Sequence, residues 1–281
     1  MSQIFQYRLK GLSRSVFAGK HASQWMSNGQ LFKRHALFTA NSDPRRIDVR
    51  ASVLDPFEHY QVRTYQQHSL LDVTLIADLS ASFSFNGERA KRECLQTVLL
   101  TIAYSALAVG DYFAFIGCGR QLEHRWLLPA NRHSGRIEDF ATQLRNAPDS
   151  PDFSSLAHVA PYLSKRRSLV FLLSDFHVAL SSLPPLLHAL KHHDVVPLVL
   201  WDTQEYEQLP AWGLVSYRDM ETANTRTLFM RPALQQQMRT AYQQRRQQLQ
   251  NSLRALGYEP LFLNTRPFVE QLNDYFRQRS R

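Results

Sequence analysis

Three short oxygen-bearing side chains follow one strongly apolar stretch of the chain. Asp78, Ser80 and Ser82 are spaced two residues apart, directly after the apolar run 71–77. Such carboxylate and hydroxyl oxygens can bind a hard divalent cation, and an aspartate in this position can also act as a nucleophile. Alternatively, the serines cap a following helix and the aspartate fixes a turn. The residue types alone leave these interpretations open.

A second aspartate stands in the same position after another apolar stretch. Asp175 follows the run 169–173 and Ser174, and the hydroxyl pair Ser154 and Ser155 lies between the two aspartates in the sequence. The carboxyl ends of two strands can lie side by side in a doubly wound sheet. Two carboxylates and several hydroxyls form an all-oxygen set that Mg²⁺ accepts, whereas metals that prefer thiolate or imidazole do not.

Apolar strands and helical patterns alternate from residue 68 to residue 201. The run 136–145 is amphipathic, with apolar residues at the spacing i, i+3, i+4 and i+7. This alternation predicts an α/β fold with a doubly wound, mostly parallel sheet and right-handed crossovers. We expect strands at 71–77, 112–117, 125–128, 168–173 and 195–201, and helices at 88–107, 136–145, 155–163 and 182–192. Gly117-Cys118-Gly119 is interpreted as a turn.

The pattern changes after residue 201. The stretches 214–217 and 225–230 predict a hairpin, and Pro232 opens a long helix to about residue 256. That helix has a narrow apolar seam among Gln and Arg residues, so it either packs on the domain or binds a partner helix or RNA. A last strand at 260–263 and a closing helix at 269–276 complete the expected domain, 67–281, in which 214–256 is an insertion.

Residues 1–66 predict an irregular or β-rich N-terminal segment without a long helix. Its most informative stretch is NSDPRRIDVRAS at 41–52, where Asp43 and Pro44 set a turn and three arginines surround Asp48. Arg45, Arg46 and Arg50 either tie this turn through ion pairs or clamp a phosphate or carboxylate.

Composition limits the remaining classes of protein. The 281 residues are 44% hydrophobic and 20% charged, and the net charge of +9 divides into +6 over 1–66, −3 over 67–217 and +6 over 218–281. Anionic partners therefore fit the flanks better than a nucleic acid fits the centre. The two cysteines, Cys94 and Cys118, form no disulfide framework or metal knuckle, and the N-terminus has no apolar core of signal-peptide length. We expect a cytoplasmic protein without a transmembrane segment.

Three enzyme classes lack their motifs. A phosphoaspartate enzyme requires a second Asp where Ser80 stands, a dinucleotide site requires glycines after the first strand, and no GxSxG sequence accompanies the eleven histidines. His177, two residues beyond Asp175, is close enough to take part in chemistry. A Mg²⁺-dependent hydrolase or phosphotransferase that uses Asp78 remains the enzymatic alternative, and nucleic-acid binding through the basic flanks is a further one.

The stretch ADLSASF resembles the metal-ion-dependent adhesion site, or MIDAS, of von Willebrand factor A domains, whose first strand ends in DxSxS. Together with the flanking stretches SDPRRIDVRAS and RRSLVFLLSDF, it resembles the bacterial domain of unknown function 58 family. That resemblance implies a Rossmann-like fold of von Willebrand factor A type. It also implies a magnesium site, or one for Mn²⁺ or Ca²⁺, in which Ser154 takes the place of the usual Thr and Ser155 that of an Asp. The implied ligands are Asp78, Ser80, Ser82, Ser154 and Asp175.

The same resemblance implies an adaptor rather than an enzyme. Members of the family are typically encoded near MoxR-type AAA+ ATPases and are thought to mature or remodel client proteins, including by metal insertion into dehydrogenases such as methanol dehydrogenase. The expected partners are therefore a MoxR-type ATPase and a protein whose acidic side chain completes the metal coordination. No nucleic acid is expected, and peripheral association with a membrane complex is left open.

Overall fold

The computed structural model describes residues 4–9, 18–27, 31–39, 43–80, 91–148, 150–201, 212–218, 225–263 and 267–279. The chain divides into two compact units. The small unit consists of residues 9–71, and the α/β unit consists of residues 1–8 together with 72–281. The first eight residues, which the sequence groups with the N-terminal segment, thus lie with the α/β unit.

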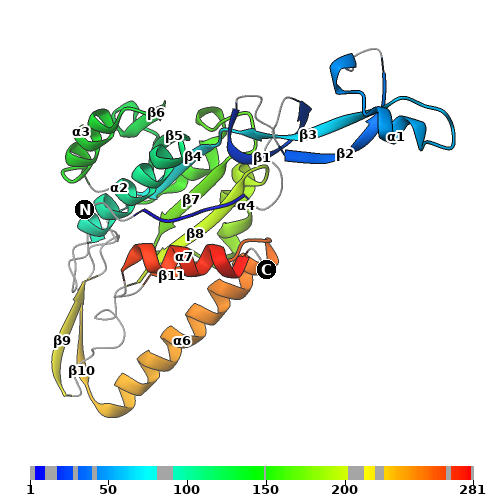
Figure 1. Ribbon diagram of the computed structural model, residues 1–281. Helices are drawn as coiled ribbons and strands as arrows, with labels where there is room; N and C mark the ends of the chain where they lie inside the picture. The colour runs from blue at the N-terminus through cyan, green and yellow to red at the C-terminus, as the bar shows by residue number, and fades with distance from the viewer. Residues whose placement is uncertain are drawn as a thin grey trace. The chain divides into compact units, whose positions relative to one another are not determined.

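A six-stranded sheet forms the centre of the α/β unit (Figure 1). Its order is β11-β8-β7-β4-β5-β6, and only the β5–β6 pair is antiparallel. Numbered along the chain, these six strands have the order 3-2-1-4-5-6, in which the sheet grows outward in both directions from β4. The strands are β4 (Asp72–Asp78), β5 (Tyr112–Cys118), β6 (Leu127–Asn131), β7 (Leu169–Ser174), β8 (Asp194–Leu200) and β11 (Leu261–Leu263). The doubly wound, mostly parallel α/β fold predicted from the sequence is confirmed.

Helices cover both faces of this sheet, which is why its strands read as continuous apolar runs. On one face, Phe115 of β5 packs against Phe140 of α3 (Ser134–Leu144), with ring centroids 5.2 Å apart, and α3 in turn packs on α2 (Lys91–Val109). On the other face, Ile76 of β4 belongs to a buried cluster that includes Leu249 and Leu253 of α6 (Pro232–Ala255).

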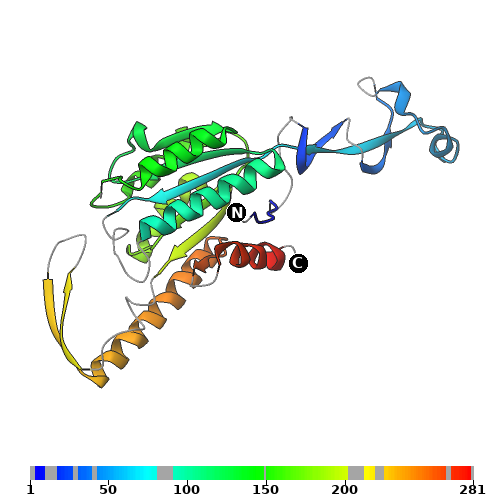
Figure 2. The ribbon, with the colours of Figure 1, turned by 60° about the vertical axis from the view of Figure 1, so that its left-hand side comes forward.

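The C-terminal part of the chain matches the predicted hairpin and long helix. Strands β9 (Gly213–Arg218) and β10 (Thr225–Met230) pair antiparallel, and Figure 2 shows this hairpin at one end of α6. Pro232 occupies the first turn of α6, where its missing N–H leaves no helical hydrogen bond unmade. The last helix, α7 (Phe268–Arg279), follows β11. No helix in the described ranges is both long and apolar enough to cross a lipid bilayer.

Three sequence interpretations differ from the structure. Residues 155–163 form two 3-10 turns, Ser154–His158 and Ala160–Tyr162, in place of one helix. Residues 182–192 contain only the short helix α4 (Leu183–Leu187) between two further 3-10 turns. Pro161 explains the first change, because it cannot donate the N–H that continues an α-helix. The prolines at 184 and 185 lie in the first turn of α4, so they do not explain why α4 ends at Leu187. The predicted turn at 117–119 is wrong, because β5 continues through Cys118.

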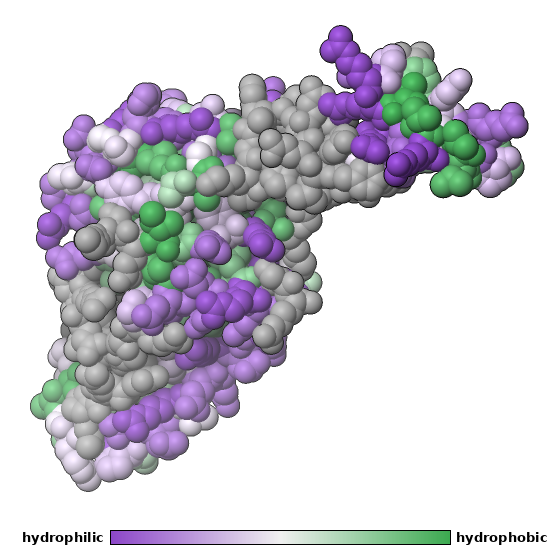
Figure 3. All heavy atoms as spheres, viewed as in Figure 1, coloured by the Kyte–Doolittle hydropathy of each residue, from purple (hydrophilic) through white to green (hydrophobic). Residues whose placement is uncertain are grey.

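The small unit is built on a three-stranded antiparallel sheet with the order β1-β3-β2. Its elements are β1 (Ala18–Ser27), β2 (Leu31–Leu37), α1 (Val49–Val53) and β3 (Gln61–Ser69). Several of its apolar side chains lie on the surface, as Figure 3 shows, and Val53, Leu54 and Phe57 are 78%, 81% and 77% exposed. These three apolar side chains of the small unit therefore contribute little to apolar burial.

Candidate metal-binding site

The candidate site lies where the sheet changes its winding direction. Strands β4 and β7 are parallel neighbours, with Ala77 opposite Leu173, and the next strands along the chain lie on their outer sides. In open α/β sheets with this topology, ligands bind at the carboxyl ends of the two central strands. Asp78 ends β4 and Asp175 directly follows β7, so the topology places both aspartates at that position.

Asp78 is a buried carboxylate held by neutral donors. Only 1% of the residue is exposed. Its Oδ1 accepts the Ser80 backbone N–H at 2.8 Å, and its Oδ2 accepts the Ser174 hydroxyl at 2.7 Å. No cationic side chain among the described residues forms an ion pair with it. Burial, together with the nearby negative charge of Asp175, raises the pKa of Asp78 to about 7.

Asp175 is equally buried, and the backbone around it is tightly hydrogen-bonded. Its Oδ1 accepts the His177 backbone N–H at 3.2 Å, and its main-chain oxygen accepts the Trp201 indole N–H at 2.6 Å. The next residue, Phe176, has a φ of 51°, in the left-handed region that bulky residues rarely adopt. The surrounding hydrogen bonds therefore hold a strained backbone beside the carboxylate.

The serines predicted as ligands have different surroundings. Ser80 is buried and forms an isolated parallel bridge with Ser150, whereas Ser82 lies outside the described residues. Ser154 is exposed, and its hydroxyl donates to Asp152 Oδ1 at 2.6 Å. The structure thus brings Asp78, Ser80 and Asp175 to one end of the sheet, and it occupies the Ser154 hydroxyl with another carboxylate. The five-ligand set stays a prediction.

Ser155, which lies outside the predicted set of five ligands, is a buried hydroxyl. It is only 2% exposed, its N–H donates to the Gly119 carbonyl at 3.1 Å, and its Oγ has no nitrogen or oxygen partner among the described residues. The Cys118 thiol lies beside it and is a weak hydrogen-bonding group. Cys118 also lies opposite Asp78 in the β4–β5 pair. The spacing of the Ser154–Ser155 pair gave no sign of which hydroxyl faces the core.

This arrangement fits a hard divalent cation. The donors are carboxylate and hydroxyl oxygens, which suit Mg²⁺ better than metals that prefer sulfur or imidazole. A bound cation would also supply the positive charge that the buried Asp78 carboxylate otherwise lacks. No cluster of three or more His, Cys, Asp or Glu residues suited to a metal occurs in the described ranges.

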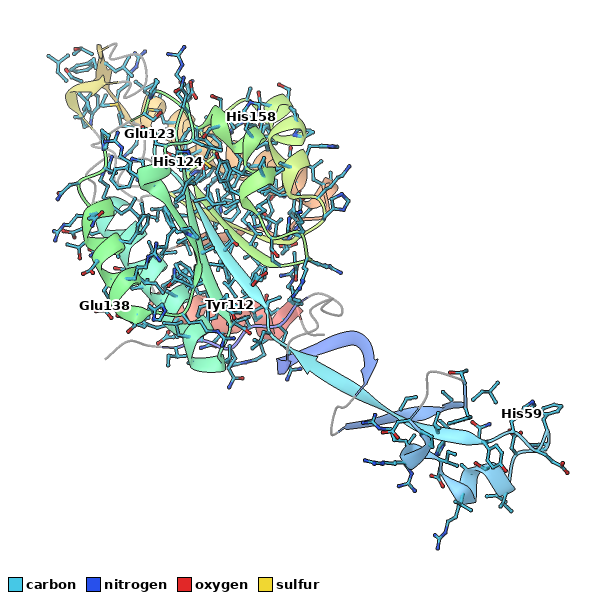
Figure 4. The ribbon with its side chains drawn as sticks, turned by 90° about the horizontal axis from the view of Figure 1, so that it is seen from above. His59, Tyr112, Glu123, His124, Glu138 and His158 are labelled. Atoms are coloured by element: carbon cyan, nitrogen blue, oxygen red, sulfur yellow. The ribbon has the colours of Figure 1, made fainter. Side chains whose placement is uncertain are left out.

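Ionisable side chains surround this end of the sheet. Figure 4 shows Glu123 and His124, which follow β5, and His158, on the 3-10 turn that begins at Ser154, toward the carboxyl ends of the strands. Tyr112, which begins β5, lies at the opposite end.

In the small unit, Asp48 organises the predicted arginine segment through different partners from those expected. Its Oδ1 accepts the N–H groups of Arg50 and Ala51, which caps α1. Its Oδ2 accepts Arg63 Nε at 2.7 Å and lies 3.0 Å from His35 Nε2. Arg63, from β3, pairs with Asp48 because strand pairing brings distant residues together, and within the predicted turn Arg46 Nε lies 3.9 Å from Asp43 Oδ2.

Replacing Arg63 by glutamine is expected to raise the pKa of Asp48. The hydrogen bonds from Arg63 and His35 hold the pKa of this carboxyl well below its ordinary value of 3.8. The stability from this contact is therefore present above about pH 4 and is lost as the pH falls further. NMR titration of the carboxyl carbon should show an ionised wild-type Asp48 at pH 3 and a midpoint nearer 3.8 in Arg63→Gln. The exposed Arg45 provides the control, and an equal shift in Arg45→Gln would contradict this assignment.

Comparison with known proteins identifies similar sequences and folds. A family model described as "Protein of unknown function DUF58" matches residues 42–252. Uncharacterized protein Rv1480 of Mycobacterium tuberculosis and uncharacterized protein Mb1516 of Mycobacterium bovis are each 23% identical over 257 residues, which is 89% of this chain and 79% of each relative.

Three solved structures illustrate the likeness of fold. An aerotolerance-related membrane protein from Bacteroides fragilis aligns over 74% of this chain and 97% of its own, with 11% identity and a TM-score of 0.46. The conserved hypothetical protein BatB from Bacteroides thetaiotaomicron aligns over 75% and 98%, with 10% identity and a TM-score of 0.43. The SpRpn10 VWA domain aligns over 47% and 74%, with 12% identity and a TM-score of 0.33.

Proposed function

The chain belongs to the DUF58 family of proteins of unknown function, and from this premise we propose that it is a metal-dependent protein-binding adaptor. Its fold, of von Willebrand factor A type, is consistent with a protein-interaction module. One observation carries the proposal: Asp78 is buried beside Asp175 at the switch point of the sheet, and the groups that hydrogen-bond its carboxylate among the described residues are neutral. A divalent cation supplies the missing charge.

The residues that would hold Mg²⁺ are the predicted set, Asp78, Ser80, Ser82, Ser154 and Asp175. Ser155 Oγ is a further candidate oxygen, because it lies beside Cys118, which is opposite Asp78 in the β4–β5 pair. Such a set has few carboxylates, so a bound cation keeps positive character and an open coordination position. When bound, the cation supplies a point of attachment for an acidic side chain of a partner protein. The chain's own aspartates and hydroxyls orient that cation, and the burial of both carboxylates limits their contact with water.

We extend the proposal to the identity of the partner. The family resemblance points to a MoxR-type AAA+ ATPase, acting with this chain in the cytoplasm on client proteins. One client reaction of that kind is metal insertion into a dehydrogenase such as methanol dehydrogenase. In this arrangement the ATPase performs the work of remodelling, and the metal site supplies a reversible contact. No catalytic residue is assigned to this chain.

Binding of a purified MoxR-type ATPase from the same organism tests the proposal. The full chain is immobilised, and retention of the ATPase is measured with Mn²⁺ and with EDTA. We expect retention with Mn²⁺ that falls at least tenfold with EDTA and in Asp78→Ala. Asp72→Ala is the matched control, because Asp72 begins the same strand at its other end and hydrogen-bonds Ser164.

The outcomes separate the two parts of the proposal. If retention of the ATPase is unchanged by EDTA and by Asp78→Ala, metal-dependent binding is excluded. Mn²⁺ uptake without retention of the ATPase would leave a metal site with another partner. Hydrolysis of a generic phosphoester that Asp78→Ala abolishes would replace the adaptor with an enzyme.

A further inference from the structure

The main-chain carbonyls of the loop after β7 accept hydrogen bonds from side chains of other elements. The Asp175 carbonyl accepts Trp201 Nε1, at the end of β8. The Phe176 carbonyl accepts Arg245 Nη2 of α6 at 3.3 Å, and the Val178 carbonyl accepts the same Arg245 nitrogen. Three carbonyls within four residues are thus fixed by two side chains.

The backbone N–H groups of this loop are fixed as well. Phe176 N–H donates to Ser174 Oγ at 2.9 Å, and His177 N–H donates to the Asp175 carboxylate. Phe176 keeps its positive φ although its side chain is 99% buried. A non-glycine residue in that region is strained, so the loop needs external contacts to remain there.

Arg245 is well placed to supply such contacts, because its helix is anchored on both sides of it. One turn before Arg245, Tyr242 packs against Trp201 with ring centroids 4.9 Å apart, and one turn after it, Leu249 is fully buried. Residues three and four apart share one face of a helix, so all three side chains face the sheet. The guanidinium then reaches two carbonyls with charge-assisted hydrogen bonds.

We propose that Arg245 is a positioning residue for the metal site, which fixes the Asp175 loop so that the Asp175 carboxylate faces Asp78. This inference rests on the proposed metal-dependent function. It adds that a residue of α6 determines the orientation of one metal ligand. Removal of Arg245 frees two carbonyls and the strained Phe176, so that the loop relaxes and Asp175 no longer lies in one orientation. The metal affinity falls although Arg245 touches no ligand oxygen itself.

The experiment compares Arg245→Ala with the neighbouring Arg246→Ala in the full chain. Arg246 is exposed, and its guanidinium lies over the Phe262 ring, 4.5 Å from the centroid, so its loss removes an arginine without touching the loop. Mn²⁺ affinity is measured from the EPR signal of free Mn²⁺. We expect a 10–100-fold loss in Arg245→Ala, the range typical of residues that orient metal ligands, and less than a twofold change in Arg246→Ala.

A second measurement needs no metal. Hydrogen exchange of the amides of residues 176–178 in EDTA should be at least tenfold faster in Arg245→Ala than in the wild type and in Arg246→Ala. Arg245→Lys keeps the charge and one hydrogen bond, so it should recover part of the Mn²⁺ affinity, and it serves as the test if the alanine variant does not fold.

The failures of the two proposals are distinguishable. If the wild type takes up no Mn²⁺, both the metal site and the positioning role are overturned. If the wild type binds Mn²⁺ and Arg245→Ala and Arg245→Lys bind it equally well, only the positioning role is overturned. The same conclusion follows if both arginine-to-alanine variants lose affinity to the same extent.

Discussion

Asp78→Asn is expected to stabilise the metal-free protein at pH 8 by up to about 4 kcal/mol. Burial and Asp175 raise the pKa of Asp78 from 3.8 to about 7 in the folded state. A shift of this size corresponds to about 4 kcal/mol, at 1.36 kcal/mol for each pKa unit. Asparagine removes the charge but keeps an oxygen that can accept the Ser80 N–H.

The pH dependence of this effect has a definite sign. Below about pH 4 both the folded and the unfolded states carry the proton, so the wild type suffers no penalty. Between about pH 4 and pH 7 the folded state binds more protons than the unfolded state, and the free energy of unfolding falls as the pH rises. Above pH 7 the full penalty is present. The difference between Asp78→Asn and the wild type should therefore grow from pH 4 to pH 7 and then level off.

Urea unfolding in EDTA at pH 4, 6 and 8, followed by circular dichroism, measures this difference. Asp72→Asn, at the other end of β4, is the control for loss of a carboxylate. Addition of Mg²⁺ should narrow this difference, because a ligand at 100 times its Kd stabilises the wild type by about 2.7 kcal/mol, whereas the asparagine variant lacks the carboxylate that would bind the cation. A lower stability of Asp78→Asn than of the wild type at pH 8 in EDTA would contradict this account.

The central sheet could be predicted because its strands are recognisable as apolar runs in the sequence. β4, β7 and β8 are buried on both faces, so nearly every residue in them is apolar, and the alternation with helices implies parallel pairing. The small unit carries no such signal. β3 contains Gln61, Arg63 and Thr64 among other polar residues, and its sheet is defined by backbone pairing with β1 and β2.

The residues of the candidate site could be predicted only where they stand directly after a recognisable strand. Asp78 and Asp175 each follow an apolar strand, so the sheet topology brings them together. Arg245 gives no comparable signal, because it lies in a run of Gln and Arg residues and contacts a carbonyl 69 residues earlier in the chain. Trp201 likewise reaches Asp175 only through the pairing of β8 with β7. Contacts set by tertiary packing have no fixed spacing, so no local pattern indicates them.

Phe5→Ala is expected to destabilise the α/β unit by about 3–5 kcal/mol, the usual cost of removing a fully buried phenylalanine. Phe5 is 1% exposed and lies 6.0 Å, between ring centroids, from both Phe171 of β7 and Phe276 of α7. Its N–H also donates to Ser105 Oγ of α2 at 3.1 Å. The side chain thus joins β7 and α7, and its removal leaves a cavity among rings that cannot easily close it.

Ile4→Ala is the matched control, because Ile4 is adjacent in the chain and 52% exposed. Urea unfolding in EDTA should show a change within about 0.5 kcal/mol for Ile4→Ala, as is usual for surface positions. Equal effects of the two substitutions would show that residues 4–8 contribute little. Nearby, Tyr7 donates to Asp111 Oδ2 at 2.5 Å, which fixes the same segment through a buried hydrogen bond. Because these contacts hold residues 4–8 on the α/β unit, the small unit is enclosed in the sequence by two parts of its neighbour, and loss of Phe5 should lower the stability of the sheet that carries the candidate metal site.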